Sequence, residues 1–165
     1  MTVRLLLMRH AKSSWKVEGQ KDHERPLNKR GREDAPGIAR RLQQVGWVPE
    51  LALVSDAART EETWAWMTGE FTPSPRLELL SSLYHGDLDD IRAAVRAHVG
   101  DEQTVLVLGH NPGWEAAVAE LSGRWERFTT ANVALLEHQA SWGVALERTD
   151  WSMVDILRPR PPRLA

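Results

Sequence analysis

Two histidines and two arginines in this chain of 165 residues stand at or just after the ends of apolar runs. Arg9 and His10 follow the first run, Arg59 comes soon after the second, and His110 follows the third. Guanidinium groups bind phosphate oxygens through paired hydrogen bonds, and a neutral imidazole nitrogen can attack phosphorus. These residue types therefore favour phosphoryl-transfer chemistry, provided that the fold brings the four side chains together.

The three apolar runs are typical of strands that are buried on both faces of a parallel sheet. They cover residues 5–8, 51–54 and 104–109. In open α/β sheets, ligands bind at the edge formed by the carboxyl ends of the strands, and right-handed crossovers bring those ends to the same edge. We therefore expect the two histidines and the two arginines to converge there.

Segments with helical spacing alternate with these strands. One begins after Asn28, an expected N-cap, and Pro36 either kinks this helix or lies in the opening turn of its main part. A second helix carries Arg59 in its first turn. A third covers residues 88–99, with Asp87 as its expected N-cap.

The second half of the chain continues the alternation. Asn111 and Pro112 are expected to be the N-cap and the first residue of a further helix. Shorter strands are expected over residues 77–80, 131–137, 143–148 and 152–157, and a frayed tail over residues 159–162. The pattern predicts an α/β fold with a mainly parallel sheet sandwiched by helices, in a single domain covering residues 1–165.

Residues 11–27 are polar, are interrupted by Gly19 and Pro26, and are expected to form a long loop over the end of the first strand. Loops longer than about 12 residues inside compact domains are usually functional. Trp15 in this loop, and Trp114 beside His110, either line a pocket or contribute to packing. Tyr84 and His85 present the same two alternatives.

The expected convergence creates a site for an oxyanion. Backbone N–H groups at the helix start after His110 add donors, and Arg9, Arg59 and a protonated His110 neutralise charge on a phosphoryl group. Since the chain has no cysteine, the expected nucleophile is the imidazole of His10, which would carry the group as phosphohistidine. The remaining histidines lack ligand spacing, so no metal site and no cofactor are expected.

Composition excludes several classes of protein. The formal charge of −2 argues against a general binder of nucleic acid or of anionic membranes. The absence of cysteine excludes disulfides and thiolate metal sites. No signal peptide and no apolar segment of about 20 residues is recognisable, so we expect a cytoplasmic protein without membrane contact. No apolar stripe outside the predicted sandwich demands a partner, and we expect a monomer.

Four motifs resemble those of the histidine phosphatase superfamily, and within it the short phosphohistidine phosphatases of the SixA type. They are Leu7-Met8-Arg9-His10-Ala11, Arg25-Pro26-Leu27-Asn28-x-x-Gly31, Ser55-x-x-x-Arg59-Thr60-x-x-Thr63 and Val107-Leu108-Gly109-His110-Asn111-Pro112. The resemblance covers residues 3–157 and implies a three-layer, phosphoglycerate mutase-like fold. Many superfamily members have glycine after the catalytic histidine, where this chain has Ala11.

The resemblance implies that His10 is the phosphorylated nucleophile and that Arg9, Arg59 and His110 form the phosphate pocket. It also assigns Arg25 and Asn111 to substrate binding. For Arg25 a second interpretation is equally compatible with the sequence, namely a surface salt bridge with Asp22 or Glu24.

The chain departs from many superfamily members at the residue that protonates the leaving group. Mutases and many phosphomonoesterases carry a glutamate after a strand, whereas the corresponding stretch here has Ser82. An alkoxide needs that proton, while imidazole, with a conjugate-acid pKa of about 6.5, leaves more readily. The departure favours phosphoramidate substrates, although Glu78, His85 or Asp87 could supply a proton by another route.

Three hypotheses follow for the function. The first is a metal-independent phosphohistidine phosphatase whose substrate is a phosphorylated protein or a small phosphoramidate. The second is a phosphomonoesterase or mutase for a small phosphorylated metabolite. The third, from another class, is a non-catalytic module that binds phosphate groups, and retention of all four pocket residues argues against it.

Overall fold

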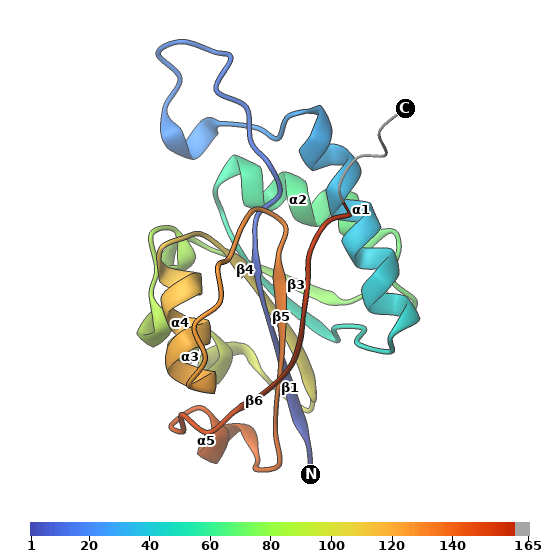
Figure 1. Cartoon of the computed structure of the whole chain (residues 1–165), viewed down its shortest axis with the longest axis vertical. Helices are drawn as coiled ribbons and strands as arrows, with labels where there is room; N and C mark the ends of the chain where they lie inside the picture. The colour runs from blue at the N-terminus through green and yellow to red at the C-terminus, as the bar shows by residue number, and fades with distance from the viewer. Residues whose placement is uncertain (161–165) are drawn as a thin grey trace.

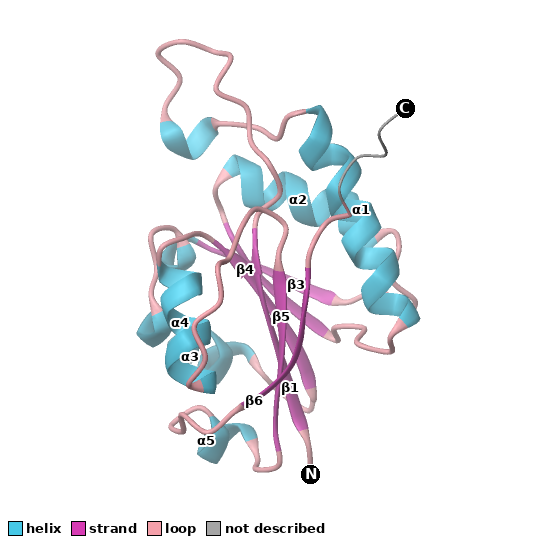
Figure 2. Ribbon diagram, viewed as in Figure 1, coloured by secondary structure: helices cyan, strands magenta, loops and turns pink. Residues whose placement is uncertain are grey.

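The structure, a computed structural model, describes residues 1–160, and a six-stranded sheet runs through them (Figures 1 and 2). The strands are β1 (Val3–Arg9), β2 (Leu51–Ser55), β3 (Arg76–Leu80), β4 (Thr104–Gly109), β5 (Val133–His138) and β6 (Ser152–Leu157), in the spatial order β3-β2-β4-β1-β5-β6. The first four strands run parallel, whereas β5 pairs antiparallel with β1, and β6 with β5. The predicted α/β fold with a mainly parallel sheet is confirmed.

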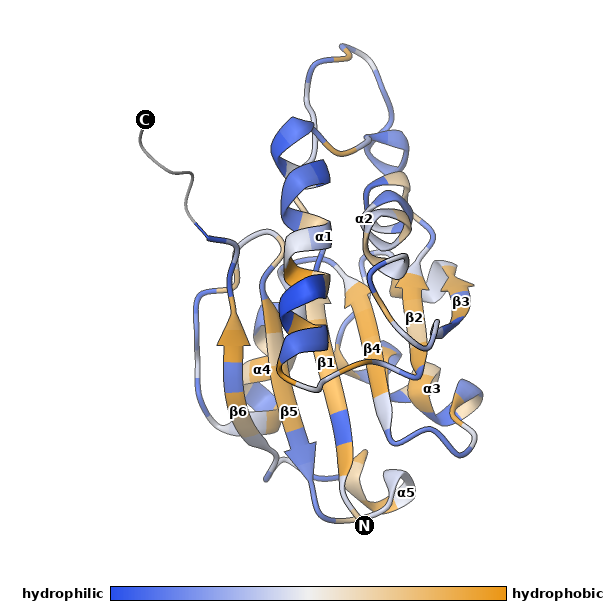
Figure 3. Ribbon diagram, turned by 90° about the vertical axis from the view of Figure 1, so that its right-hand side faces the viewer, coloured by the Kyte–Doolittle hydropathy of each residue, from blue (hydrophilic) through white to orange (hydrophobic). Residues whose placement is uncertain are grey.

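Helices cover both faces of the sheet. The helices α1 (Lys29–Gln44) and α2 (Ala58–Thr68) lie on one face, and α3 (Leu88–His98), α4 (Gly113–Ser122) and α5 (Trp142–Ala145) lie on the other (Figure 1). Leu6 and Met8 of β1 pack toward α1 and α2, while Leu5 and Leu7 pack toward α3 and α4. Residues 5–8 of β1 are buried on both faces of the sheet, which accounts for their continuous apolar run, and Figure 3 shows the central strands as mainly hydrophobic.

The ends of the helices follow the expected local chemistry in most cases. The Asn28 side chain accepts a hydrogen bond from the backbone N–H of Gly31 at the start of α1. Pro36 lies inside this helix, which is continuous, so the second of its two interpretations is wrong. Asp87 caps α3 as predicted and forms a capping box with Asp90.

Two predictions in the second half of the chain are wrong. Residues 143–148 do not form a strand, since Trp142–Ala145 is the short helix α5, and a short apolar run does not distinguish the two states by periodicity. Asn111 is not the N-cap of α4, which begins at Gly113 with Pro112 at the cap position. The predicted frayed tail lies outside the described residues from residue 161 onward.

The loop over residues 11–27 projects beyond the sheet at the end opposite the N-terminus (Figure 1). Its base is closed by backbone hydrogen bonds from Ser14 N to Pro26 O (2.8 Å) and from Asn28 N to Lys12 O (3.0 Å). The loop contains a single turn of 3-10 helix, Asp22–Glu24. Within residues 1–160, no helix is both long enough and apolar enough to span a bilayer.

Candidate active site

The pairing of β1 with β4 places the two histidines next to each other. Arg9 lies opposite Gly109 in the parallel register, and the backbone N–H of His10 donates to the carbonyl of Gly109 at 3.0 Å. His10 and His110 therefore leave neighbouring strands at the same edge, and their ring centroids are 5.4 Å apart. The convergence expected from the sequence is present in the structure.

The hydrogen bonds of His10 define which ring nitrogen carries the proton. Nδ1 lies 2.7 Å from the backbone oxygen of Ala11, which can only accept, so Nδ1 is the donor. Nε2 lies 3.3 Å from Nε of Arg59, which can only donate, so Nε2 is an acceptor with a lone pair. The ring is thus a neutral tautomer whose basic nitrogen faces the guanidinium.

The surroundings of His10 favour this neutral form. Its ring is buried, and burial lowers the pKa of His10 to about 3, with further lowering by the charges of Arg59 and Arg9. The backbone acceptor on Nδ1 opposes the shift without reversing it. At neutral pH the lone pair on Nε2 is therefore available for attack on an electrophile.

Arg59 is held in the first turn of α2 by the helix itself and by its neighbours. Thr60 Oγ1 donates to the backbone oxygen of Ser55 at 2.7 Å, which ties the helix start to the end of β2. Thr63 Oγ1 donates to the Arg59 carbonyl at 2.6 Å and accepts from the Ala11 N–H at 3.1 Å. This threonine links the helix to the residue that orients His10.

His110 is held by the end of β2. Its Nε2 lies 2.8 Å from Ser55 Oγ, and its Nδ1 is buried and has no hydrogen-bond partner within residues 1–160. Burial lowers the pKa of His110 to about 3, and the neighbouring His10 and Arg59 add to the shift. Burial therefore outweighs the attraction of Asp22 in this arrangement, and the expected protonation of His110 beside a phosphoryl group stays a prediction.

Arg9 lies at the end of β1, where its Nη1 donates to the backbone oxygen of Phe128 at 3.3 Å. Its Nε is buried and has no partner among the described residues 1–160. Together with Nδ1 of His110, it is an unsatisfied buried nitrogen beside the His10 ring. Such groups are costly unless a ligand oxygen satisfies them.

Arg25 forms one of the ion pairs that the sequence offered for it, while its assignment to substrate binding stays a prediction. Its Nε donates to Asp22 Oδ1 at 3.1 Å, so the ion pair with Asp22 exists. The Arg25 half of the pair is buried, at 7% exposed, whereas the Asp22 side chain is 42% exposed. Nη1 of Arg25 also donates to Ser13 Oγ at 2.8 Å. The Trp15 ring stacks on the guanidinium, with its centroid 3.4 Å from Cζ.

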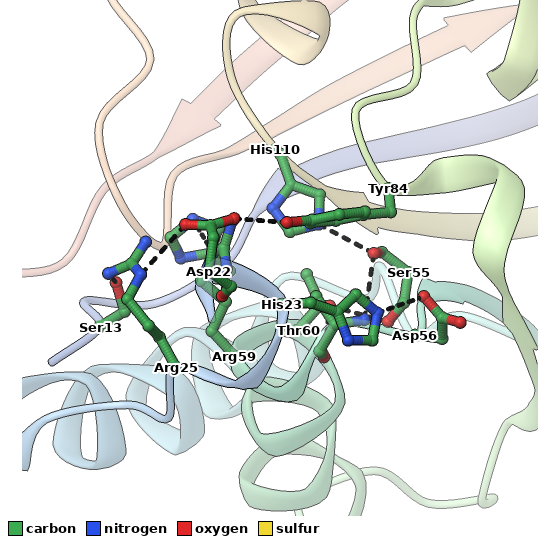
Figure 4. Close-up of polar contacts among 12 residues, drawn as sticks. Ser13, Asp22, His23, Arg25, Ser55, Asp56, Arg59, Thr60, Tyr84 and His110 are labelled. Carbon is green, nitrogen blue, oxygen red and sulfur yellow. Dashed lines mark hydrogen bonds and ion pairs between the residues drawn. The ribbon is translucent and has the colours of Figure 1, made fainter. Parts of the chain in front are cut away.

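Asp22 is a residue of the site that the sequence did not assign to it, and Tyr84 is one for which the sequence left two alternatives open. The Asp22 carboxylate accepts from Arg59 Nη2 at 3.0 Å, from Arg25 Nε and from the Tyr84 hydroxyl at 2.5 Å (Figure 4). The Tyr84 hydrogen bond and the two guanidinium groups hold the pKa of Asp22 well below its usual range. The spacing of Asp22 from Arg25 was a usable signal, whereas nothing in the sequence linked it to Tyr84.

Asn111 and Trp114, two further candidates from the sequence, form hydrogen bonds to the protein itself. Asn111 binds the protein itself, since its Nδ2 donates to Phe128 O at 2.7 Å and its Oδ1 accepts from the Glu115 N–H. Trp114 is fully buried, and its indole N–H donates to Val107 O, so it belongs to the core. Its ring fills the space beside Gly109, where an added Cβ would lie 2.2 Å from Cζ2.

The residues considered as proton donors are mostly engaged elsewhere. Glu78 pairs with Arg76 on the edge strand β3, and Asp87 caps α3. His85 is different, because its ring lies 3.9 Å from that of Tyr84, and the Tyr84 ring lies 5.5 Å from that of His110. Asp22, the one carboxylate within residues 1–160 that pairs with Arg25 or Arg59, is held in its ionised form.

Comparison with known proteins agrees with this geometry. Residues 5–146 match the model of the histidine phosphatase superfamily (branch 1). An uncharacterised chloroplastic protein of Arabidopsis thaliana is 38% identical over 143 residues, which is 81% of this chain, and the match spans 66% of the plant protein.

Two solved structures assigned as phosphohistidine phosphatase SixA have the same fold. The protein from Nakamurella multipartitia has a TM-score of 0.81 at 28% identity, covering 96% of this chain and 97% of its own. The protein from Agrobacterium tumefaciens has a TM-score of 0.79 at 26% identity, covering 95% and 99% respectively.

Proposed function

Because the chain belongs to the histidine phosphatase superfamily, we propose that it is a phosphatase in which His10 is the nucleophile and phosphohistidine is the substrate. The observation that carries the proposal is the neutral His10 ring, whose Nε2 lone pair lies 3.3 Å from the Arg59 guanidinium. A phosphoryl group bound to Arg59 lies next to the nitrogen that would attack it.

The proposed reaction has two steps. The lone pair of His10 Nε2 forms a bond to phosphorus while the bond from phosphorus to the substrate imidazole breaks, and the protonated imidazole leaves as a neutral ring. Water then attacks phosphorus, the bond to Nε2 breaks, and the lone pair returns to His10 as inorganic phosphate forms. The Nδ1–H bond to the Ala11 carbonyl stabilises the positive ring of the intermediate.

The proposed phosphate pocket consists of Arg59, Arg9 and His110. Arg59 binds two phosphoryl oxygens at once through its guanidinium. Arg9 Nε and His110 Nδ1, which have no hydrogen-bond partner within residues 1–160, donate to the phosphoryl oxygens. Burial makes these donors stronger than they would be in water. The charge of a bound phosphoryl group also favours protonation of His110, which would then neutralise one of the equatorial oxygens.

The leaving group distinguishes the proposed substrate from phosphate esters. Asp22, the carboxylate in contact with the pocket arginines, stays ionised and cannot give a proton. The leaving group of phosphohistidine is an imidazole with a conjugate-acid pKa of about 6.5, so its departure needs no strong proton donor from the protein. The site therefore favours a phosphorylated histidine on a protein, or a small phosphoramidate with the same kind of leaving group.

The proposal is tested by comparing three substrates: a short peptide whose histidine has been phosphorylated with phosphoramidate, p-nitrophenyl phosphate and a sugar phosphate. We expect the peptide to have the highest kcat/KM, and an acid-labile phosphate to appear on the protein. His10→Ala should abolish both turnover and labelling, whereas the matched variant His98→Ala on α3 should retain them. Turnover by His10→Ala, or a clear preference for the esters, would overturn the proposal.

A phosphomonoesterase is the second candidate, and His85 is the observation that favours it. Its ring lies against Tyr84, whose ring is 5.5 Å from that of His110, and from there His85 could protonate an ester oxygen. If the protein is an esterase, His85→Ala lowers ester turnover about a hundredfold or more and leaves phosphohistidine turnover unchanged. Tight binding of phosphate without any labelling would instead support a non-catalytic phosphate-binding module.

A further inference from the structure

The lysines of this chain are confined to one short segment. All four, Lys12, Lys16, Lys21 and Lys29, lie within residues 12–29, and every basic residue with a long side chain elsewhere is an arginine. Three of them belong to the loop over residues 11–27, and the fourth begins α1. The loop projects past the sheet edge that carries the candidate active site (Figure 1).

These lysines differ from the arginines in what they bind. All four are exposed, and no ion pair within residues 1–160 involves a lysine. Asp22, in the same segment, is bound by Arg25 and Arg59, which leaves Glu18 and Glu24 as the exposed acids without an ion pair there. The segment thus presents an excess of free positive charge on a chain whose net charge is −2.

Exposed apolar side chains accompany the lysines. Trp15 is 77% exposed and Val17 is 59% exposed. The inner face of Trp15 stacks on Arg25, whose guanidinium binds the Asp22 carboxylate in the pocket. Tryptophan is the residue most enriched among those that dominate binding energy in protein interfaces. A partner that contacts Trp15 is therefore connected to Arg59 through the side chains of Arg25 and Asp22.

We propose that this lysine rim, formed by Lys12, Lys16, Lys21, Lys29, Trp15 and Val17, docks an acidic protein surface that surrounds a phosphorylated histidine. The proposal rests on the proposed function, because it names the macromolecular form of that substrate. A small phosphate ester is bound by the pocket arginines alone, whereas charges spread along a projecting loop attract an extended anionic surface. Trp15 and Val17 supply apolar contact, and the lysines supply the positive charge along the same segment.

A protein partner fits the rim better than a nucleic acid does. The rim is interrupted by Glu18 and Glu24, which would repel a continuous phosphate backbone but can face basic positions on a folded partner. Exposed lysine ammonium groups contribute mainly to the rate of encounter, and that contribution weakens as salt is added. The proposal therefore predicts a salt-dependent KM effect and an unchanged kcat.

The test uses three peptides phosphorylated on histidine by phosphoramidate, flanked by aspartate and glutamate, by glycine and serine, or by lysine. The rim variant is Lys12→Gln, Lys16→Gln, Lys21→Gln and Lys29→Gln combined. The control removes four exposed arginines elsewhere, with Arg40→Gln, Arg96→Gln, Arg124→Gln and Arg148→Gln combined. Initial rates are measured in 20 mM and 200 mM NaCl, and circular dichroism verifies that both variants are folded.

We expect the wild-type protein to prefer the acidic peptide over the glycine and serine peptide by about tenfold in kcat/KM at low salt. The rim variant should lose this preference and its salt dependence while keeping kcat, and the control should keep both. Equal kcat/KM values for the three peptides, or a preference that survives in the rim variant, would overturn the docking proposal.

The outcomes separate this proposal from the proposed function. If no peptide is dephosphorylated, the proposed function has failed, whereas turnover of all three at one rate contradicts only the docking surface. A single-stranded oligonucleotide added as competitor decides between macromolecules. Stronger competition by the oligonucleotide than by the unphosphorylated acidic peptide would replace the protein partner with a nucleic acid and overturn the proposal.

Discussion

Nε of Arg59 donates a hydrogen bond to Nε2 of His10 across 3.3 Å. The bond joins the first turn of α2 to the end of β1, so two elements that are distant in the sequence fix the direction of the histidine lone pair. The other two nitrogens of the same guanidinium point toward Asp22. Groups that are oriented before substrate arrives need little rearrangement in the transition state, which is the main source of electrostatic catalysis.

The first prediction concerns the shape of the Arg59 side chain rather than its charge. Arg59→Lys keeps a positive charge but loses the planar fork that contacts both His10 and the phosphoryl oxygens. We expect kcat on a phosphohistidine peptide to fall by about 10²–10³. Arg76→Lys, in the exposed ion pairs of β3, is the matched control and should change kcat less than about twofold. Near-normal kcat in Arg59→Lys would show that charge alone suffices.

The second prediction concerns competition for the Arg59 guanidinium. The Asp22 carboxylate accepts a hydrogen bond from Nη2, and its charge repels a phosphate dianion. Asp22→Asn should therefore lower the inhibition constant of inorganic phosphate by about fivefold, or about 1 kcal/mol, since the Asp22 side chain is 42% exposed and water screens its charge.

The control for Asp22 is Asp56→Asn, which removes a carboxylate that binds His23 rather than Arg59. Its inhibition constant for phosphate should stay close to that of the wild-type protein. If Asp22→Asn instead raises the constant, Asp22 serves to hold Arg59 and Arg25 in place, and the competition argument is wrong.

The convergence of the main site residues could be predicted because it depends on chain direction. The apolar run of residues 5–8 leads to Arg9 and His10, and the apolar run of residues 105–108 leads to His110. Parallel strands end at one edge of a sheet, so these side chains meet there. The link from Asp22 to Tyr84 could not be predicted, since it joins a loop to a residue 62 positions away. Their roles in catalysis stay a prediction until the variants are measured.

The lowered pKa of His110 shows why burial limits inference from sequence. Its neighbours Arg59 and His10 could be anticipated, but the extent of desolvation depends on how tightly the strand ends pack. The error over residues 143–148 has a similar origin. Trp142 is buried and its indole donates to Glu102 O, a tertiary contact that local periodicity does not encode.

The third prediction compares two glycines of α1. A Cβ on Gly31 would lie 2.2 Å from the backbone oxygen of Lys12, two residues after His10, whereas a Cβ on Gly37 would meet nothing within 4 Å. Gly31→Ala should destabilise the protein by about 1–3 kcal/mol and lower kcat, because the backbone beside His10 must move. Gly37→Ala should stabilise it by about 0.5–1 kcal/mol without affecting kcat. Urea denaturation and initial rates measure both effects, and equal behaviour of the two variants would contradict the prediction.

The last prediction follows from the lowered pKa values of His10 and His110. Both pKa values are about 3 in the folded protein, and an unperturbed histidine has a pKa of about 6.5. Between these values the unfolded chain binds protons that the folded protein does not bind, so stability rises with pH and falls on acidification. As the pH falls from 6 to 4, each histidine should lower the free energy of unfolding by about 1.4 kcal/mol per pH unit.

Urea denaturation at a series of pH values measures this slope. His10→Asn should reduce the slope by about 1.4 kcal/mol per pH unit, because the asparagine side chain does not titrate in this range. The same substitution at His98, on α3 and outside the site, supplies the reference. A wild-type slope in His10→Asn would mean that His10 takes up a proton as readily when folded as when unfolded. Burial would then not keep the Nε2 lone pair of His10 free at acidic pH, and His10 could not act as the nucleophile there.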